Sequence, residues 1–204
     1  MAAPSIFVID DQKAVRNALG EMLRVFGHRV QTYDSAESFL QGFSIACIGC
    51  IVADVRMPGM DGIEFVRELA RRRICLPVVL ISGHADVPMA VAAIKAGAED
   101  FIEKPINDTH LLAAINRSLV GYFDKLSRER TVEELRARMG RLTPREAEVM
   151  DLVVEGFTSQ AIALRLHISQ RTVESYRVQI MDKMQAESVS VLVRQAIRMG
   201  RITP

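Results

Sequence analysis

Residues 51–62 read IVADVRMPGMDG, a short apolar run that ends in one carboxylate, Asp54, and leads into a turn rich in proline and glycine. Three further apolar runs end close to polar residues: Ile6–Ile9 before Asp10 and Asp11, Val78–Ile81 before Ser82, and Phe101-Ile102 shortly before Lys104. Such runs predict buried parallel strands, each followed by a helical segment. Because ligands of an open parallel α/β sheet bind at the carboxyl ends of the strands, we expect these polar groups to converge.

Convergence of Asp10, Asp11 and Asp54 would determine the chemistry at this edge of the sheet. Like charges a few ångströms apart cannot all stay ionised unless a cation neutralises them, and Mg²⁺ is commonly held by carboxylates together with phosphate oxygens. A carboxylate in such a site can act as a nucleophile and form an acyl phosphate. Asp54 is the candidate because it stands alone at a turn-rich loop, with Lys104 and the Ser82 hydroxyl as partners of the phosphoryl oxygens. Any one of these positions alone would be read as a solvated loop residue, so the prediction depends on all four strand ends together.

Over about the first 125 positions, these residues resemble the receiver domain of bacterial response regulators, which has a flavodoxin-like (βα)5 fold with a parallel sheet. The resemblance implies that Asp54 is the phosphoacceptor and that Mg²⁺ is the cofactor. The metal ligands that it implies are Asp10, Asp11, Asp54 and the backbone carbonyl of Arg56. It also implies that Ser82 and Phe101 rearrange on phosphorylation and that Lys104 precedes a cis proline. Phe101 lacks the hydroxyl of the tyrosine often found at this position, so its movement would be steric.

The charges divide unequally along the chain. Up to Lys125 there are 13 basic and 15 acidic residues, a net charge of −2, and from Leu126 onward there are 13 basic and 10 acidic residues, a net charge of +3. We therefore expect two domains, an acidic one that binds a metal and one that can approach an anion. The sequence has no run of about 18 apolar residues and no signal-peptide pattern, so we expect a soluble, cytoplasmic protein with no membrane partner.

Three cysteines are too few and too irregularly spaced for a disulfide framework. Cys47 and Cys50 form a Cys-x-x-Cys pair, but this pair leads into a predicted strand, whereas a redox pair normally lies at a helix N-terminus that lowers the thiol pKa. We interpret Cys50 as a core residue and Cys75 as a packing or loop residue, with a redox sensor as the less favoured alternative.

A helical linker is predicted over residues 126–141, and apolar residues before and within it have heptad-like spacing. The first set is Leu112, Ile115, Leu119, Tyr122 and Leu126, and the second set, one residue out of phase, is Val132, Leu135, Met139 and Leu142. Thr131 and Glu134 have the spacing of a capping box, so we expect a break or an overwound point near residues 127–131. The first set could pack on the receiver's own sheet, as expected up to Ile115, or pair from Leu119 onward with a helix of a second subunit.

Residues 142–204 contain four signals for the start of a helix. Thr143-Pro144-Arg145-Glu146 forms a capping box with proline at the first helical position. Thr158, Ser169 and Ser188 stand where three further helices would begin. The second and third helices would be joined by a tight turn at His167-Ile168, and the third would carry polar and basic residues on its free face. This is the helix-turn-helix arrangement that enters the major groove of DNA.

The same region resembles the LuxR/FixJ (NarL) type of output domain, an all-α four-helix domain. The residues that carry this resemblance are the Leu142–Glu146 start, the Ala161-Ile162-Ala163 step, the Ile168–Val173 turn and the Lys183-Met184 exit. Departures from the usual family residues are Tyr176, where histidine is common, and Thr158-Ser159-Gln160 in place of Asn-Lys-Glu. Together the halves resemble a FixJ-type two-component transcriptional response regulator, with a receiver at 1–125, a helical linker at 126–141 and a helix-turn-helix domain at 142–204.

This resemblance implies that a sensor histidine kinase phosphorylates Asp54 and that phosphorylation promotes homodimerisation and sequence-specific binding to double-stranded DNA, with RNA polymerase as a further partner. Candidates for the dimer surface are Val91, Lys95 and Asp100. Side chains expected to hold DNA phosphates and fix the register are Thr158, Ser159, Arg171, Thr172 and Lys183. Side chains expected to face base edges are Glu174, Ser175, Val178 and Gln179. Because one half-site buries a limited surface, useful affinity should require two copies.

Two other functions would use some of the same residues. Haloacid-dehalogenase-like phosphotransferases use similar Asp, metal and Lys groups, but their nucleophile lies in an Asp-x-Asp pattern on the first strand. Here adjacent aspartates, Asp10 and Asp11, end that strand and Asp54 lies elsewhere, so we do not expect an enzyme. A constitutive DNA-binding protein with a purely structural receiver is the second alternative, and the presence of every expected pocket residue disfavours it.

Overall fold

The protein divides into two compact units, Met1–Asp124 and Lys125–Pro204. The structure is a computed structural model and describes residues 3–44, 47–83 and 86–202. The first unit contains a five-stranded sheet in which every pairing is parallel and the strand order is β2-β1-β3-β4-β5. The strands are β1 Ser5–Ile9, β2 Arg29–Tyr33, β3 Gly49–Asp54, β4 Val78–Ser82 and β5 Asp100–Glu103. The predicted flavodoxin-like receiver fold is therefore confirmed.

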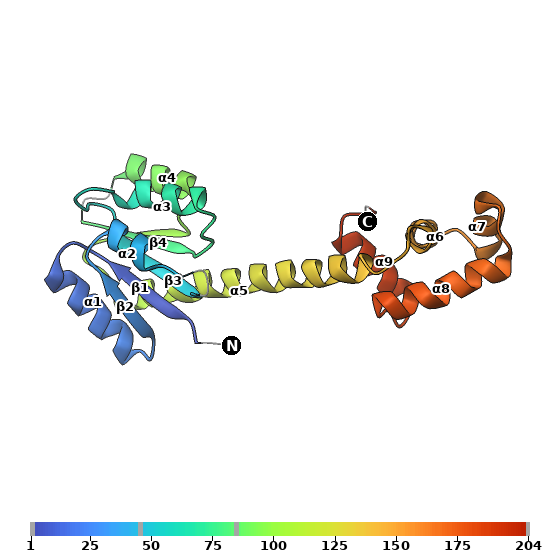
Figure 1. The fold of residues 1–204 in the computed structure, drawn as a ribbon. Helices are drawn as coiled ribbons and strands as arrows, with labels where there is room; N and C mark the ends of the chain where they lie inside the picture. Colours follow the sequence, from blue (N-terminus) through green and yellow to red (C-terminus); the bar gives the residue numbers. More distant parts are fainter. Residues whose placement is uncertain (1–2, 45–46, 84–85, 203–204) are drawn as a thin grey trace. The chain divides into compact units, whose positions relative to one another are not determined.

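Helices cover both faces of this sheet (Figure 1). They are α1 Lys13–Val25, α2 Ala36–Gly42, α3 Gly62–Arg71, α4 Val87–Ala96 and α5 Asp108–Met139. One apolar layer joins α1 and α5 to the sheet through Leu23, Leu111 and Ile115. On the other face, the ring of Phe39 makes edge contacts with Phe7 and Phe65. Because both faces are covered, the central strands can be apolar throughout, which is the pattern that the sequence shows.

Helix α5 runs without interruption from Asp108 to Met139. The predicted break near residues 127–131 is therefore wrong. Thr131 does not cap a new helix, since its hydroxyl donates to the Ser127 carbonyl one turn earlier at 2.9 Å. A threonine inside a helix can satisfy its hydroxyl in this way and leave the backbone hydrogen bonds intact, so the capping pattern was misleading here.

The first apolar set of α5 serves the core of the receiver well beyond Ile115. Leu119 is buried and belongs to the layer between α1, α5 and the sheet, and Tyr122 is also buried within this chain. Of the two alternatives for these residues, packing on the receiver's own sheet is the one that the structure supports. A partner helix is not needed to cover them.

Replacing Leu119 by alanine should lower the free energy of unfolding of the receiver by about 2–3 kcal/mol, since it removes buried methyl groups and leaves a cavity. Urea denaturation would measure the loss. Val120 is the matched control, because it is the next residue of the same helix and is 63% exposed. Val120→Ala should change stability by less than about 0.5 kcal/mol. Unchanged stability in Leu119→Ala, together with weakened dimerisation, would instead make this residue part of a subunit interface.

The second unit is helical, and its helix starts follow the predicted caps. Its helices are α6 Pro144–Val154, α7 Ser159–Leu166, α8 Gln170–Met184 and α9 Val189–Arg198. Thr143 and Glu146 form the predicted capping box, and Thr158, Ser169 and Ser188 each accept a hydrogen bond from a backbone N–H of the helix that follows. His167 has a left-handed backbone, with φ at 54°, and ends α7 at the tight turn before α8. In the described ranges, we find no helix with the length and apolar character needed to cross a bilayer.

Candidate functional site

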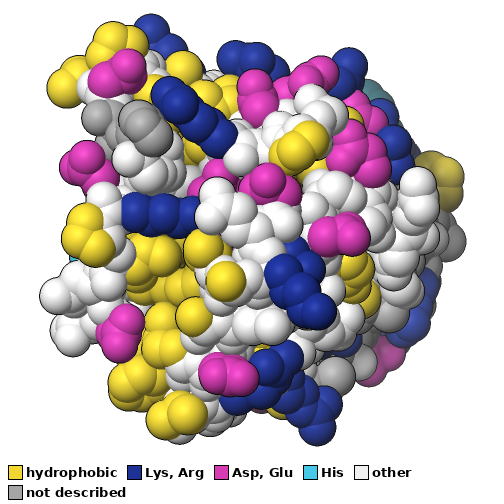
Figure 2. Space-filling model, turned by 90° about the vertical axis from the view of Figure 1, so that its left-hand side faces the viewer, with side chains coloured by type: hydrophobic (Ala, Val, Ile, Leu, Met, Phe, Trp, Pro, Cys, Tyr) yellow, Lys and Arg dark blue, Asp and Glu magenta, His cyan; other side chains and the backbone are white. Residues whose placement is uncertain are grey.

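An acidic pocket lies at the carboxyl ends of the central strands. Ile9 of β1 is in register with Ala53 of β3, so the next residues, Asp10 and Asp54, end adjacent strands. Lys104 follows β5, and its Nζ lies 2.6 Å from Oδ1 of Asp54 and 3.2 Å from Oδ2 of Asp10. Figure 2 views the protein from the side toward which the strands run in Figure 1, and acidic side chains lie there next to lysine and arginine side chains.

Backbone N–H groups bind the other oxygen of each buried carboxylate. The N–H of Arg56 donates to Oδ2 of Asp54 at 2.7 Å, and the N–H of Gln12 donates to Oδ1 of Asp10 at 2.8 Å. Each carboxylate therefore has one oxygen held by the loop that follows its own strand, while the other faces Lys104. This arrangement fixes the orientation of Asp54 before any reaction.

The electrostatics of this pocket depend on burial and on the Lys104 ammonium. Burial raises the pKa of Asp10, and the Gln12 N–H and Lys104 offset this effect only in part. Burial alone would lower the pKa of Lys104, but its hydrogen bond and charge interactions with Asp54 and Asp10 outweigh that and raise the pKa above its ordinary value. Lys104 therefore stays protonated at neutral pH and neutralises charge between the two carboxylates.

The three predicted carboxylates do not all meet in this arrangement. Asp11 is exposed, and in residues 3–44, 47–83 and 86–202 no three His, Cys, Asp or Glu side chains form a group that could hold a metal ion. The structure thus brings Asp10 and Asp54 together, with Lys104 between them, and leaves Asp11 facing solvent. Strand β1 ends at Ile9, so Asp11 lies two residues beyond it, in the short segment that leads into α1.

The two residues expected to rearrange on phosphorylation lie on neighbouring strands. Ser82 is fully buried at the end of β4, and its hydroxyl lies 3.6 Å from the sulfur of Met89 on α4. Phe101 of β5 is half-buried and lines an open pocket beside Val87 and Ala90 of α4. The ring of Phe101 thus borders free space next to α4. The peptide bond between Lys104 and Pro105 is cis, as expected.

Sequence reasoning missed a contact that braces the loop after Asp54. Oε1 of Glu37 on α2 accepts a hydrogen bond from the backbone N–H of Met60 at 2.9 Å. Gly59, whose φ is 77°, passes so close that a Cβ there would lie 2.7 Å from the same oxygen. Since 23 residues separate the two partners, no local pattern could have indicated this contact.

Helix α8 presents a polar free face, as predicted for a recognition helix. Val173 and Ile180 are buried, whereas Val178 is 70% exposed. Its exposed neighbours on that face include Arg171, Glu174, Ser175 and Gln179, and Thr158 is exposed at the start of α7, while Ser159 and Thr172 are half-buried. Tyr176, at a position where the family often has histidine, packs against the core of this unit.

Lys183 is half-buried and forms an ion pair with a buried carboxylate of the helical unit. Its Nζ lies 2.6 Å from both carboxylate oxygens of Glu146, and Glu146 is only 2% exposed. The hydrogen bond from Lys183, followed by the N–H of Thr143, lowers the pKa of Glu146. The capping-box pattern predicts the hydrogen bond from the Thr143 N–H to Glu146. No local pattern indicates that Lys183 is the second partner of Glu146. A DNA phosphate would therefore have to compete with Glu146 for the Lys183 ammonium group.

Replacing Lys183 by alanine should lower the free energy of unfolding by about 1–3 kcal/mol, because it leaves the buried carboxylate of Glu146 with one partner fewer. Urea denaturation would measure this loss.

The pH dependence of the free energy of unfolding tests the same ion pair through Glu146. Because the pKa of folded Glu146 is lowered, its stabilisation is present above the ordinary glutamate pKa and is lost as the pH falls through the folded value. The stability difference between wild type and Glu146→Gln, measured by urea denaturation, should therefore be largest near neutral pH and shrink in acid. A difference independent of pH would contradict this assignment.

Comparisons with known proteins agree with both halves of the fold. Residues 6–116 match the family model of the response regulator receiver domain, and residues 140–196 match that of bacterial regulatory proteins of the luxR family. The transcriptional regulatory protein FixJ of Bradyrhizobium diazoefficiens is 41% identical over 197 residues, which cover 97% of this chain and 96% of that protein. The response regulator protein TmoT of Ectopseudomonas mendocina is 41% identical over 194 residues, which cover 95% of this chain and 88% of that protein. Among solved structures, the response regulator StyR has a TM-score of 0.87 at 38% identity and covers 97% of this chain and 100% of its own.

These matches extend over nearly the whole chain and include both the parallel sheet with its acidic pocket and the helical unit with its exposed helix α8. They confirm the resemblance on which the expected fold was based. The chain belongs to the two-component response regulators that join a receiver domain to a LuxR-type helix-turn-helix DNA-binding domain and regulate transcription.

Proposed function

We propose that a sensor histidine kinase phosphorylates this protein on Asp54 and that the acyl phosphate promotes dimerisation and sequence-specific DNA binding. The observation that carries this proposal is the Lys104 ammonium at 2.6 Å from the Asp54 carboxylate, at the end of the central strand. A carboxylate oxygen of Asp54 would attack the phosphorus of a phosphohistidine. The new P–O bond forms as the P–N bond breaks, and the electron pair stays on the histidine nitrogen, which takes up a proton.

The pocket supplies hard oxygen donors of the kind that Mg²⁺ prefers. Asp10, Asp54 and the backbone carbonyl of Arg56 would hold this ion together with Asp11, whose exposed side chain would have to turn toward the other two carboxylates. The ion would neutralise charge on the phosphoryl oxygens. Lys104 now neutralises Asp10 and Asp54 together. When a cation takes over this task, Lys104 is free to bind a phosphoryl oxygen. The positive charge near Asp54 would thus be retained through the transfer.

A change at Asp54 could reach the surface through Ser82 and Phe101. Movement of the Ser82 hydroxyl toward the phosphoryl group would break its contact with Met89 of α4 and make room for the ring of Phe101. Phosphorylation shifts this equilibrium only if the modified pocket binds the rearranged state more tightly. The Lys104 and Ser82 contacts with the phosphoryl oxygens supply that difference.

Helix α4 carries the surface that would then form the dimer. Its exposed apolar side chains are Val87, Val91 and Ile94. Lys95 on the same helix and Asp100 at the start of β5 supply opposite charges, which suit a two-fold interface where each copy offers both. Asp100 is bound to Arg117 of α5 at 2.8 Å in the single chain, so dimerisation would rearrange or extend this ion pair.

Replacing Val91 by aspartate should weaken phosphorylation-dependent dimerisation at least tenfold, since it places a charge in the apolar part of the interface. Labelling of Asp54 by a small-molecule phosphoryl donor should be unchanged. Val25→Asp is the control, because Val25 is 84% exposed at the end of α1, on another part of the receiver. Sedimentation with and without the donor would measure both. Equal dimer constants for Val91→Asp and wild type would place the interface elsewhere.

In the helical unit, Arg171 and the hydroxyls near the starts of α7 and α8 would hold DNA phosphates. The exposed side chains in the middle of α8, including Val178, would contact base edges. Lys183 would contact a DNA phosphate only if it binds Glu146 at the same time, because Glu146 already holds its ammonium group. RNA polymerase is the expected partner of the DNA-bound dimer.

A further inference from the structure

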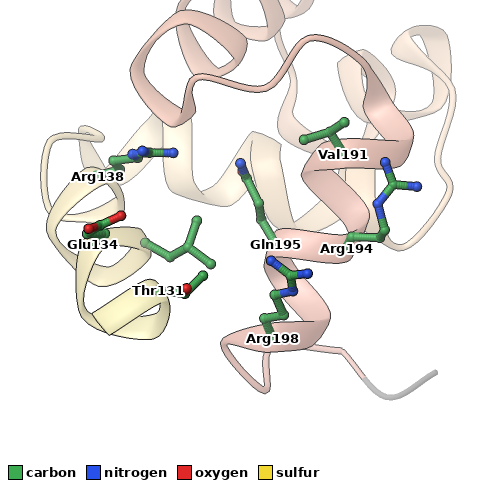
Figure 3. Close-up of a pocket in the computed structure, with 8 residues that line it drawn as sticks. Thr131, Glu134, Arg138, Val191, Arg194, Gln195 and Arg198 are labelled. Carbon is green, nitrogen blue, oxygen red and sulfur yellow. The ribbon is translucent and has the colours of Figure 1, made fainter. Parts of the chain in front are cut away.

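A pocket of about 220 Å³ lies between the C-terminal part of α5 and helix α9, within the second unit (Figure 3). None of the residues proposed for phosphorylation or DNA contact lines it. Thr131, Glu134 and Arg138 contribute from α5, and Arg194, Gln195 and Arg198 contribute from α9. The lining thus holds three arginines against one glutamate and is strongly basic.

The arginines that line this pocket have no acidic partner in the part of the chain that the structure describes. Among the residues that the structure describes, none of the three arginines forms an ion pair, and Arg138 only approaches the Met184 carbonyl at 3.5 Å. In Figure 3, Arg138, Gln195 and Arg198 lie around the space between the two helices, whereas Arg194 points away along α9 and Glu134 lies at the outer edge on α5. Two guanidinium groups therefore stand on opposite sides of the same space.

Gln195 supplies a second, independent observation that points to a ligand. It is only 8% exposed, and its Nε2 donates to the Met184 carbonyl at 3.3 Å. Its Oε1 is the one buried side-chain oxygen or nitrogen in the described part of the chain without a hydrogen-bond partner. Buried acceptors are nearly always paired, so this oxygen calls for a donor. Because the oxygen itself has almost no accessible surface, the Gln195 side chain would have to turn before a ligand hydroxyl could reach it.

We propose that this pocket binds a small anion that also carries a hydroxyl group, of the class of short phosphate esters and hydroxycarboxylates. Arg138 and Arg198 would hold the anionic group from α5 and α9, because a guanidinium fits a phosphate or carboxylate with paired hydrogen bonds. A hydroxyl of the ligand would donate to Oε1 of Gln195. The volume lies below the roughly 300–1,000 Å³ of pockets for drug-sized ligands, which favours molecules smaller than a nucleotide.

A ligand in this pocket would connect α5 to α9. It would therefore stabilise the helical unit, and the temperature of unfolding should rise with ligand concentration. The position of the pocket makes it a site at which a metabolite could act on the helix that enters this unit from the receiver, independently of phosphorylation.

Titration calorimetry of the full-length protein would test this proposal, with a chelator present and ionic strength held constant. The probes are glycerol 3-phosphate and citrate, which carry a hydroxyl, and inorganic phosphate and sulfate, which lack a carbon-bound one. We expect saturable binding to one site, with glycerol 3-phosphate or citrate bound more tightly than the inorganic ions. The preferred probe distinguishes a phosphate ester from a carboxylate.

Arg138→Ala and Arg198→Ala should each weaken binding of the preferred probe at least tenfold, and Arg141→Ala, an exposed arginine outside the lining, should leave it within about twofold. Gln195→Leu should remove the preference for the hydroxyl-bearing probe. Thermal unfolding of each variant shows whether it is folded. If Arg198→Ala does not fold, Arg198→Lys replaces it, because lysine keeps the charge but loses the paired hydrogen bonds of the guanidinium. No saturable binding of any probe, or equal weakening by Arg141→Ala, would overturn the proposal. So would loss of DNA affinity in Arg138→Ala with small-anion binding unchanged, which would make the pocket a DNA contact.

Discussion

Asp54→Asn should reduce labelling by a small-molecule phosphoryl donor and Mg²⁺ to background, whereas the wild type should take up one hydroxylamine-labile phosphoryl group. An asparagine amide has no anionic oxygen to attack phosphorus, while its shape leaves the strand end intact. The expected effect on DNA binding is the loss of any increase produced by the donor. Intact-protein mass spectrometry would measure the first result, and DNA titration the second.

Asp61→Asn is the matched control for this experiment. Asp61 lies in the same loop and caps α3 by accepting the N–H of Glu64 at 2.7 Å, a task that asparagine performs equally well. Labelling of this variant should stay near the wild-type level. A full phosphoryl group on Asp54→Asn would move the phosphoacceptor to another residue. Lys104→Ala is expected to behave differently from both, with labelling still possible but no longer coupled to dimerisation.

Replacing Arg171 or Val178 should have separable effects on DNA binding. Arg171→Ala removes an exposed cation near the start of α8 and should weaken all DNA sequences to a similar degree, with the slope of log affinity against log salt reduced by roughly 0.9. Val178→Ala should leave the salt slope unchanged. It should weaken the free energy of binding by about 1–3 kcal/mol on duplexes that carry the base pair preferred by the wild type, and much less on the others. Arg171 is the better test of a phosphate contact than Lys183, which is already bound to Glu146.

Fluorescence anisotropy on a set of duplexes that differ at one position, each at several salt concentrations, would measure both variants. Arg165→Ala controls for the general charge of the domain, since Arg165 is exposed on α7 and lies over the ring of Phe157. If Arg171→Ala and Val178→Ala changed salt dependence and base preference alike, the division of α8 into phosphate and base contacts would be wrong.

The sheet and the helix starts could be predicted from sequence because local rules determine them. Apolar runs that end in polar residues located the strands, and residues such as Thr143 and Ser169 satisfied the backbone N–H groups that a helix start leaves open. The pairing of Asp10 and Asp54 followed from the general geometry of parallel sheets. These features need no knowledge of distant contacts.

The errors and omissions arose where a distant contact or an alternative local bond decides the outcome. Thr131 has a capping pattern, yet its hydroxyl bonds back within α5, so the helix continues. Lys183 looks free in sequence, but Glu146, 37 residues away, holds it. In each case, the residue type was read correctly and its partner was not.

The most direct test of phosphorylation-gated DNA binding uses a duplex selected from random sequences by the phosphorylated protein. This duplex is titrated with full-length wild type and with Asp54→Asn, each with and without phosphoryl donor and Mg²⁺. A coupling free energy of about 1–3 kcal/mol between phosphorylation and binding corresponds to a gain of about 5- to 150-fold. We predict such a gain for the wild type, together with a shift from monomer to dimer in sedimentation, and neither change for Asp54→Asn. Equal affinity of the wild type in both conditions would contradict gating and favour a receiver that only dimerises a constitutive DNA-binding protein.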